Sequence, residues 1–393
     1  MWNSKKEPIP QPLNPVQMSS LRFIVAGGGT GGHIFPALSI AEAIRELEPT
    51  ALFQFVGARG KMEMEKVPQA GFQIEGLDIV GFNRHNPIKN LTLPIKLLRS
   101  FFHVRSIFRR FRPTAVVGVG GYSSYPVLRY AQAQGIPTFL HEANSYAGKT
   151  NQWLAKHATQ IYVGMRGMEK FFPTDKMVFT GNPVRTNILQ TTVDRTDALH
   201  SFGLDPAKPT VLVIGGSLGA RSINEALQTG WEKLIGAGIQ LIWQTGQSGA
   251  SLPPIPGAAE SMIYRTPFIR EMDKAYAAAD LVVSRSGAMS VAELEVVGKP
   301  SVLVPYPLAA EDHQTSNARQ LVGAGAALLV RDADAASELI DRVLELMHDE
   351  PRRRQMGEQS YQLGVRDADR RIARLILKKL KNNDSEDTLK NAL

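Results

Sequence analysis

The sequence predicts two α/β domains, each a doubly wound parallel sheet, which face each other across a cleft. Three observations lead to this prediction. The chain has 393 residues, which is long for one domain and comfortable for two. Short apolar runs alternate with segments of helical periodicity. A buried strand followed by a glycine turn and a helix occurs twice, near residues 21 and 211, so each half begins like a separate domain.

Ten apolar runs are expected to form strands, namely 21–26, 51–56, 115–119, 137–141, 160–163, 177–180, 211–215, 239–243, 280–284 and 301–304. The chain should cross between domains near 181–183, where Gly-Asn-Pro breaks the pattern. This predicts an N-terminal domain over 20–185 and a C-terminal domain over 186–365. A basic helix over 366–384 is expected to pack back on the N-terminal domain. The proline-rich residues 1–19 and residues 385–393 are expected to be disordered tails.

Composition excludes several classes of protein. The chain contains no cysteine, which excludes disulfides, thiolate catalysis and cysteine-built zinc sites. Its N-terminus has no apolar core of the kind that a signal peptide needs. No apolar run approaches the roughly 18 to 20 residues of a membrane-spanning helix. We therefore expect a soluble protein, which can still touch a membrane surface.

The net charge of +8 is unevenly distributed. No acidic residue lies between Asp78 and Glu142, and residues 82–111 mix arginine and lysine with large apolar side chains. This mixture suits an anionic lipid surface. The alternative is a core helix with a solvated cationic face. Nucleic acid is a third option, but no recognisable nucleic-acid-binding module accompanies the window.

The first glycine turn, AGGGTGGH over 26–33, places five glycines between a buried strand and a helix. Backbone amides and the helix dipole make such a turn an anion site, and Pro36 is expected in the first turn of the helix. A dinucleotide site also needs a carboxylate at the end of the next strand. That strand ends in Gly57, Ala58 and Arg59, which argues against an NAD-dependent oxidoreductase.

Two further turns of this kind lie in the second half, GGSLGARSIN over 215–224 and SRSGAMSVAEL over 284–294. Their amides suit phosphate groups. Glu293 falls in the second turn of the expected helix, where a carboxylate can accept hydrogen bonds from sugar hydroxyls. Phosphate-binding amides beside a hydroxyl-binding carboxylate predict a sugar-nucleotide site. The alternative is that Glu293 is a solvated helix residue.

Seven motifs, in this order, resemble one family, the UDP-N-acetylglucosamine transferases that convert peptidoglycan lipid I to lipid II. They are GGGTGGH (27–33), GVGGYSSYP (118–126), HEAN (141–144), GNPVR (181–185), GGSLGA (215–220), SRSGAMSVAEL (284–294) and DHQTSNA (312–318). The resemblance covers about residues 20 to 365. The sequence departs from the family at Ala143, where glutamine is more usual, and this puts one polar contact near the sugar in doubt.

The resemblance implies a GT-B glycosyltransferase fold of two Rossmann-like domains. It also implies inverting transfer, without metal or cofactor, to the muramoyl 4-hydroxyl of an undecaprenyl-diphosphate-linked acceptor. The C-terminal domain should bind UDP-N-acetylglucosamine and the N-terminal domain the lipid-linked muramoyl-pentapeptide. The protein should sit peripherally on the cytoplasmic face of the inner membrane, docked through residues 82–111 and in reach of other cell-wall synthesis proteins.

Matched residue by residue, the resemblance implies donor contacts at Thr30, Gly31, Gly32, Asn144, Arg185, Ser217, Ile269, Ala288, Met289, Ser290, Val291, Ala292, Glu293 and Gln314, with Asn224 and Arg285 also at motif positions. His33, Tyr122, His141 and Glu142 lie in motifs associated with acceptor binding and catalysis.

Inverting transfer needs a base for the acceptor hydroxyl and a way to stabilise the departing UDP. His33 is the preferred base, because neutral imidazole titrates near working pH. Glu142 is the rival and His141 a weaker one, and His33 can alternatively serve only to bind locally or to position the acceptor. Tyr122 either hydrogen-bonds the acceptor or packs as core.

Two other functions remain open on the sequence alone. One is a GT-B transferase acting on another lipid acceptor such as diacylglycerol. The other is a catalytically inactive sugar-nucleotide-binding module.

Overall fold

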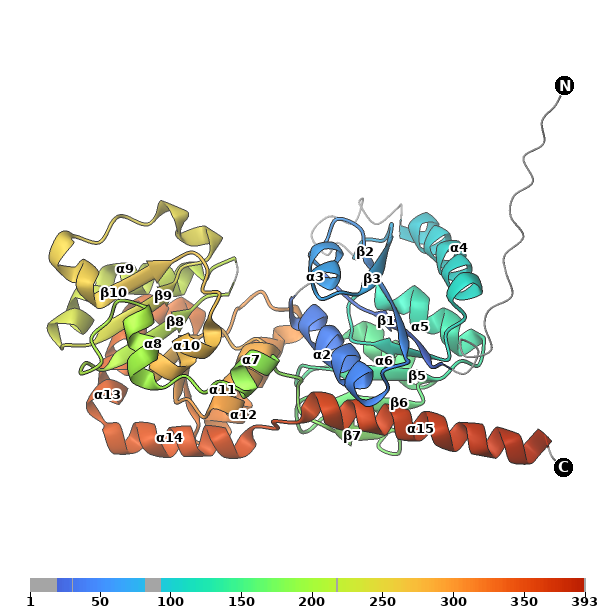
Figure 1. Ribbon diagram of the computed structural model, residues 1–393. Helices are drawn as coiled ribbons and strands as arrows, with labels where there is room; N and C mark the ends of the chain where they lie inside the picture. Colours follow the sequence, from blue (N-terminus) through green and yellow to red (C-terminus); the bar gives the residue numbers. More distant parts are fainter. Residues whose placement is uncertain (1–19, 30, 82–92, 217, 392–393) are drawn as a thin grey trace, which may run out of the picture.

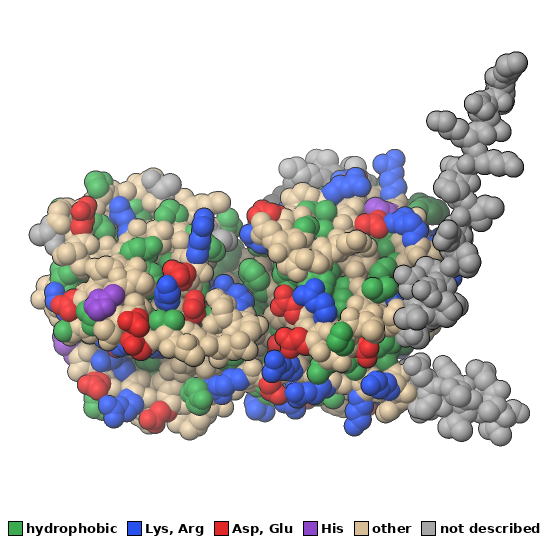
Figure 2. Space-filling view, viewed as in Figure 1, with side chains coloured by type: hydrophobic (Ala, Val, Ile, Leu, Met, Phe, Trp, Pro, Cys, Tyr) green, Lys and Arg blue, Asp and Glu red, His purple; other side chains and the backbone are tan. Residues whose placement is uncertain are grey.

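The computed structural model describes residues 20–391, apart from residue 30, residues 82–92 and residue 217. Within that range the chain forms two α/β domains side by side, as the sequence predicts (Figure 1). In the space-filling view they are two lobes with an indentation between them (Figure 2). The predicted tail 1–19, the candidate ligands Thr30 and Ser217, and the first part of the 82–111 window lie outside the described residues.

The N-terminal domain is a seven-stranded parallel sheet in the order β3-β2-β1-β4-β5-β6-β7. Its strands are β1 (Arg22–Ala26), β2 (Leu52–Ala58), β3 (Gln73–Leu77), β4 (Ala115–Gly118), β5 (Thr138–Glu142), β6 (Gln160–Val163) and β7 (Met177–Phe179). One face packs against α4 (Leu93–Phe111), α5 (Ser124–Ala133) and α6 (Lys149–Ala155). The other face packs against α2 (Gly31–Leu47), α3 (Glu63–Gln69) and α15 (Ala368–Asn391).

The C-terminal domain is a six-stranded parallel sheet in the order β10-β9-β8-β11-β12-β13. Its strands are β8 (Thr210–Ile214), β9 (Gln240–Gln244), β10 (Ile263–Thr266), β11 (Leu281–Ser284), β12 (Ser301–Leu303) and β13 (Ala327–Leu329). On one face lie α9 (Arg221–Gly236) and α13 (Ala335–His348), and α14 (Glu350–Leu363) follows α13 and packs beside the helix over 288–297 of the other face. On the other lie α7 (Thr186–Leu189), α8 (Arg195–Ser201), α10 (Met272–Ala278), α11 (Ala288–Val297) and α12 (His313–Gly323).

Both sheets reverse their strand order at a neighbouring pair, β1 with β4 in the first domain and β8 with β11 in the second. In open parallel sheets the loops at the carboxyl ends of such a pair form the ligand-binding crevice. All the glycine turns singled out in the sequence follow one of these four strands. The fold therefore gathers them into one crevice per domain.

The ten strands expected from the sequence are confirmed to within a few residues, but three strands were missed. The missed strands β3, β10 and β13 are all at the edges of their sheets. Inner strands are covered on both faces and read as continuous apolar runs, whereas edge strands such as QIEGL and IYRT are only partly buried. An edge position therefore weakens the signal, although the edge strand β7 was expected from its apolar sequence MVF.

Two expectations about helices are wrong. Helix α2 already begins at Gly31 within the glycine turn, so Pro36 is its sixth residue and not part of its first turn. The proline ring removes the hydrogen bond to the Gly32 carbonyl inside the helix. Helix α15 continues to Asn391, past the expected end at residue 384, because the added run lacks both glycine and proline. Its apolar side chains, including Ile372 and Ile376, join the cluster formed by β1 and α2.

The chain crosses between the domains twice. It leaves the first sheet after β7 and reaches α7 through residues 180–185, and it returns from α14 to α15 through residues 364–367. Gly181 has a φ of +76°, and a Cβ atom there would lie 2.5 Å from Cβ of Val365. The two crossing segments are therefore in direct contact. None of the described helices has the length and apolar character needed to cross a bilayer.

Candidate functional site

The candidate catalytic side chains come from the carboxyl ends of three neighbouring strands. His33 follows β1, Tyr122 follows β4, and His141 and Glu142 end β5. The sheet order places β4 between β1 and β5, so these residues converge at one edge of the N-terminal sheet.

His33 is held by the glycine turn that precedes it. Its Nδ1 lies 3.1 Å from the carbonyl oxygen of Gly28. Because a carbonyl only accepts, Nδ1 carries the proton and the lone pair of the neutral ring is on Nε2. The backbone of Gly120 approaches that side of the ring, since a Cβ atom there would lie 3.1 Å from Nε2. Burial lowers the pKa of His33, while Glu142 opposes this effect. The ring is therefore neutral, with its proton on Nδ1.

Both carboxylate oxygens of Glu142, the rival base, accept hydrogen bonds from within the protein. One oxygen accepts from the Asn144 amide nitrogen at 3.1 Å and from Asn144 Nδ2 at 3.4 Å. The other accepts from the amide of Gly148 and from Asn151 Nδ2, both at 2.9 Å. Gly148 is the residue immediately before α6, so the carboxylate ties the loop after β5 to the start of that helix. These contacts favour an organising role for Glu142 over proton transfer.

His141, the weaker candidate, is fully buried. Neither ring nitrogen has a hydrogen-bond partner within the part of the chain that the structure describes, although the backbone of Gly181 lies beside the ring. Burial lowers its pKa to about 4, with a smaller lowering from His33. A fully buried neutral imidazole is poorly placed to take a proton from a substrate.

Tyr122 is half-buried and packs against the glycine-rich backbone. Its ring would lie 3.7 Å from a Cβ atom at Gly29 and 3.0 Å from one at Gly81. Burial raises the pKa of its hydroxyl, and Glu63 adds to the effect. The phenol therefore stays protonated and available as a donor at the same edge.

Glu63 lies beneath the first glycine turn, and the sequence analysis did not single it out. Its carboxylate accepts from the Gly29 amide at 3.1 and 3.2 Å and from the Ala58 amide at 3.0 Å. The Gly29 amide, which was expected to face an anion, is therefore already bound within the protein. A glutamate 34 positions along the chain carries no local signal of this contact.

The C-terminal domain presents the start of α11 at the carboxyl end of β11. Ala288 is the first helical residue and Gly287 precedes it without a side chain that could cap the first amides. The run Ala288 to Glu293 forms the first turns of this helix, so its amide end suits a phosphate.

Glu293 is buried, so the alternative of a solvated helix residue is wrong. Nε and Nη2 of Arg185 donate to its Oε1 at 3.0 and 2.8 Å, and the hydroxyl of Tyr276 donates to its Oε2 at 3.0 Å. The Arg185 guanidinium also lies 5.6 Å from the centre of the Phe35 ring in α2. Arg185 thus connects the carboxylate to the helix that carries His33.

Two candidate donor ligands are engaged in packing instead. Arg285 donates to the carbonyls of Val304 and Pro305 and pairs with Asp332. Asn224 accepts from the Trp243 indole at 3.0 Å and donates to the Thr245 carbonyl at 2.9 Å. These contacts bind their elements together and occupy much of the hydrogen-bonding capacity of both side chains.

Gly31 and Gly32 form the first residues of α2, whereas two further candidate donor ligands lie in the C-terminal domain, Ile269 in the loop after β10 and Gln314 at the start of α12. The amide of Ile269 donates to Gln244, whose own amide donates to the carbonyl of Gly216 in the second glycine turn. The side chain of Gln314 accepts from the Tyr306 amide at 2.9 Å. Gln244 therefore links the second glycine turn to the segment that holds Ile269.

Asn317, within the DHQTSNA motif, joins the two domains. Its Oδ1 accepts from the amide of Ser145 at 3.0 Å and from its hydroxyl at 2.8 Å. Its Nδ2 donates to the Ser286 carbonyl at 3.0 Å and to Asn144 Oδ1 at 3.3 Å. Asn144, a candidate donor ligand on the first domain, is in this way fixed against the second.

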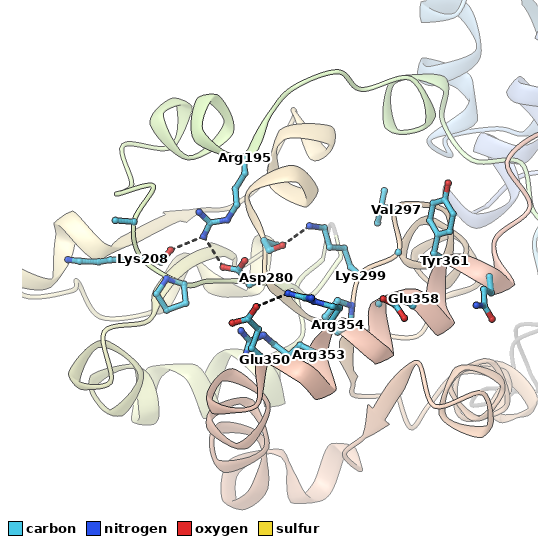
Figure 3. A pocket seen from close by; sticks show the side chains of 17 residues that line it. Arg195, Lys208, Asp280, Val297, Lys299, Glu350, Arg353, Arg354, Glu358 and Tyr361 are labelled. Carbon is cyan, nitrogen blue, oxygen red and sulfur yellow. Dashed lines mark hydrogen bonds and ion pairs between the residues drawn. The ribbon is translucent and has the colours of Figure 1, made fainter.

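A cavity of about 830 Å³ lies elsewhere, at the opposite end of the C-terminal strands (Figure 3). Arg195 pairs with Asp280 at 2.9 Å, Arg354 with Glu350 at 3.2 Å, and Lys299 donates to the Ala279 carbonyl at 2.7 Å. Most of the charged side chains that line the cavity are thus paired with other groups of its wall. Among the described residues, no group of three or more acidic or histidine side chains is placed to hold a metal ion.

Comparison with known proteins identifies both domains. Residues 23–163 match the glycosyltransferase family 28 N-terminal domain, and residues 210–372 match the glycosyltransferase family 28 C-terminal domain. The UDP-N-acetylglucosamine--N-acetylmuramyl-(pentapeptide) pyrophosphoryl-undecaprenol N-acetylglucosamine transferase of Phocaeicola vulgatus is 48% identical over 362 residues, which cover 91% of this chain and 96% of that protein. The transferase of the same name from Cytophaga hutchinsonii is 46% identical, over 89% of this chain and 95% of its own.

Solved structures agree with these matches. MurG from Acinetobacter baumannii superposes with a TM-score of 0.72 at 28% identity, covering 91% of this chain and 99% of that one. The UDP-GlcNAc 2-epimerase of Neisseria meningitidis, solved with UDP-GlcNAc bound, superposes with a TM-score of 0.62 over 91% of this chain and all of its own. At 15% identity the second similarity shows the shared fold alone.

Proposed function

The chain belongs to glycosyltransferase family 28, and from that membership we propose that it transfers N-acetylglucosamine from UDP-N-acetylglucosamine to undecaprenyl-diphosphate-linked N-acetylmuramoyl-pentapeptide, the step from lipid I to lipid II. The two parallel-sheet domains form the GT-B fold that the sequence predicts. The chain is thus a UDP-N-acetylglucosamine-dependent glycosyltransferase, and its named relatives match it over nearly their whole length.

One observation carries the assignment of the site. Arg185 binds Glu293 at the start of α11 and also lies over the ring of Phe35, two residues after His33. The base of the first domain and the donor-side carboxylate of the second are therefore connected through a single side chain. This supports a reaction centre between the domains, with the acceptor on the first and UDP-N-acetylglucosamine on the second.

In the proposed reaction, Nε2 of His33 takes the proton of the acceptor 4-hydroxyl as its oxygen attacks the anomeric carbon. The new bond forms on one side of that carbon while the bond to UDP breaks on the other, which inverts the configuration. The amide end of α11 stabilises the charge that grows on the departing diphosphate. Glu293 accepts from a sugar hydroxyl of the donor, and Glu142 keeps the loop after β5 in place.

We also propose that the protein docks peripherally on the cytoplasmic face of the inner membrane. The inner face of α4 packs on the sheet through residues such as Val104 and Ile107. Its outer face exposes Ile95, Leu98 and Phe102 at 58%, 59% and 63%. Arginines 99, 105 and 109 are exposed on the same helix, and Trp153 is exposed on α6 in the same helix layer. The mixture supports contact with anionic lipid, because a helix serving only as core would not expose three large apolar side chains.

The test is transfer by the purified protein from labelled UDP-N-acetylglucosamine, with lipid I or diacylglycerol as acceptor. We expect labelled product from lipid I only, unchanged by a metal chelator. His33→Ala should lower kcat by about 100-fold or more, the usual effect of losing a general base. Calorimetry should show unchanged binding of UDP-N-acetylglucosamine to this variant.

The two alternatives give different outcomes. Product from diacylglycerol would identify another lipid acceptor. Binding of the donor without turnover by the unaltered protein would identify a non-catalytic module.

A further inference from the structure

Glu63 is a fully buried carboxylate at the first position of α3, and its contacts converge on the turn that carries His33. Its two oxygens accept from the Gly29 amide, and one of them also accepts from the amide of Ala58 at the end of β2. Backbone donors from two strand ends thus meet on one side chain. A buried carboxylate is stable only when such donors replace its lost hydration.

The two glycines around Glu63 form a slot that fits this side chain. A Cβ atom at Gly28 would lie 2.1 Å from Glu63 Oε1, and one at Gly57 would lie 2.6 Å from Glu63 Cγ. Gly28 and Gly29 have φ values of +153° and +92°, which side chains with a Cβ rarely adopt. The glycines are therefore required both by the turn and by the carboxylate that passes beneath it.

The same turn orients the candidate base. The carbonyl of Gly28 accepts from Nδ1 of His33, and the next residue, Gly29, is the one anchored by Glu63. Moving the carboxylate would release the Gly29 amide and allow the Gly28 carbonyl to rotate. The chain of contacts runs from Glu63 through the turn to the imidazole.

We propose that Glu63 is a positioning residue of the transferase, which holds the first glycine turn so that the Gly28 carbonyl fixes the Nδ1–H tautomer of His33 and directs Nε2 to the acceptor hydroxyl. This inference rests on the proposed function. It differs from the expectation that the first turn chiefly binds an anion, because a carboxylate already occupies the Gly29 amide.

The negative charge of Glu63 also affects the pKa of His33. The pKa of His33 is lowered by burial, raised by Glu142 and by Glu63, and lowered again by His313, while His141 is a further titratable neighbour. Removing the negative charge of Glu63 should lower the pKa of His33 further. The acid limb of the kcat/KM profile, which follows the protonation of the base, should then move to lower pH.

The first experiment compares Glu63→Gln with Glu65→Gln, a change at an exposed glutamate on the same helix. We expect Glu63→Gln to lower kcat by about 10- to 100-fold with donor KM within twofold, and to shift the acid limb to lower pH. Glu65→Gln should match the unaltered enzyme in both respects. A Glu63→Gln enzyme that folds and keeps its kcat, or loses kcat without a shift of the acid limb, overturns the proposal.

A double-mutant cycle tests whether Glu63 acts through His33. In a His33→Ala background, Glu63→Gln should reduce the residual rate by less than twofold, because the side chain that it positions is gone. A further full loss in that background contradicts the inference. If Glu63→Gln does not fold, Glu63→Asp withdraws the carboxylate by one methylene and enters the same cycle.

A measurement on the unaltered protein needs neither turnover nor a folded variant. Nitrogen-15 NMR of the His33 ring should report the Nδ1–H tautomer at neutral pH. The Nε2–H tautomer overturns the inference even if lipid II is formed. Absence of transfer with the expected tautomer would instead count against the proposed function.

Discussion

Arg185 directs two nitrogens to a single oxygen of Glu293, at 2.8 and 3.0 Å, and leaves the second oxygen to the hydroxyl of Tyr276. Arg185 belongs to the segment that crosses between the domains, whereas Glu293 and Tyr276 belong to the C-terminal domain. A carboxylate accepts about four hydrogen bonds, so one position remains for a donor hydroxyl. The pair therefore fixes the orientation of Glu293 before a sugar nucleotide arrives.

Glu293→Ala tests this arrangement. We expect donor KM to rise by about 10- to 100-fold, since each lost hydrogen bond to a charged group costs on the order of 1.5–3 kcal/mol, while acceptor KM stays within twofold. Steady-state kinetics with each substrate varied in turn provide the measurement. Glu225→Ala, at an exposed glutamate on α9, is the control and should change neither value. An unchanged donor KM would remove Glu293 from the donor site.

Asn317→Leu tests the connection between the domains. The substitution leaves the Ser145 amide and the Ser286 carbonyl without their buried partner. We expect the free energy of unfolding to fall by about 2–4 kcal/mol, seen as a lower urea midpoint. Arg319→Ala, at an exposed position of the same helix, should leave the midpoint unchanged. Equal midpoints for the two variants would show that Asn317 contributes little to the stability of the interface.

Glu295 should make stability depend on pH. It lines a small cavity between the domains with Arg166 and Gln320, and burial raises its pKa to about 7, opposed by Arg166. The folded protein therefore binds its proton more tightly than the unfolded chain. The contribution of Glu295 to the free energy of unfolding is fully present below the unfolded pKa near 4.5 and is lost as pH rises through the folded pKa of about 7.

The substitution Glu295→Gln removes the titratable carboxyl group and with it this dependence on pH. Urea unfolding should give equal stability for variant and unaltered protein at pH 4, below the unfolded pKa. At pH 8 the variant should be more stable by on the order of 1–2 kcal/mol, after allowance for solvent screening. A difference that is the same at both pH values would show that Glu295 does not titrate in this range.

Vesicle flotation tests docking through α4. Binding should increase with the fraction of anionic lipid and weaken with added salt. Replacing Arg99 and Arg105 with glutamate should reduce binding at least about tenfold, since each basic residue near an anionic surface contributes about 1 kcal/mol. Leu98→Ser with Phe102→Ser should weaken binding to neutral vesicles as well. Tyr361→Ser, at an exposed aromatic residue of the C-terminal domain, is the control.

The inner strands and the turns that follow them could be predicted because their signals are local. Residues 22–26 read as a strand from their apolar run, and the glycines after them mark a turn. Three of the four edge strands could not, because partial burial allows polar residues such as those in QIEGL, whereas the edge strand β7 was expected from its apolar sequence MVF. Position on the sheet, which the sequence does not state, decides how apolar a strand must be.

For the candidate site, too, local features could be predicted from the sequence and contacts between distant residues could not. Motif position brought His33 and Glu142 to one edge, but only the structure shows that Glu142 is saturated with donors while His33 has an oriented ring. Arg285 carries a charge suited to a diphosphate, yet it pairs with Asp332, 47 positions away. Glu63 and Asn317 act over 34 and 172 positions, distances at which no periodicity or motif links partners. The residue types at the candidate site could therefore be predicted from the sequence, whereas the pairing of distant side chains could not.

Gly181 and Val365 touch where the two connections between the lobes pass each other. Because both connections pass through this one contact, we expect it to be the hinge of any rotation of one domain against the other. Asn317 and Glu295 lie at further contacts between the domains, which such a rotation would have to alter. A side chain at position 181 would press against Val365, and we expect it to change the angle between the two domains.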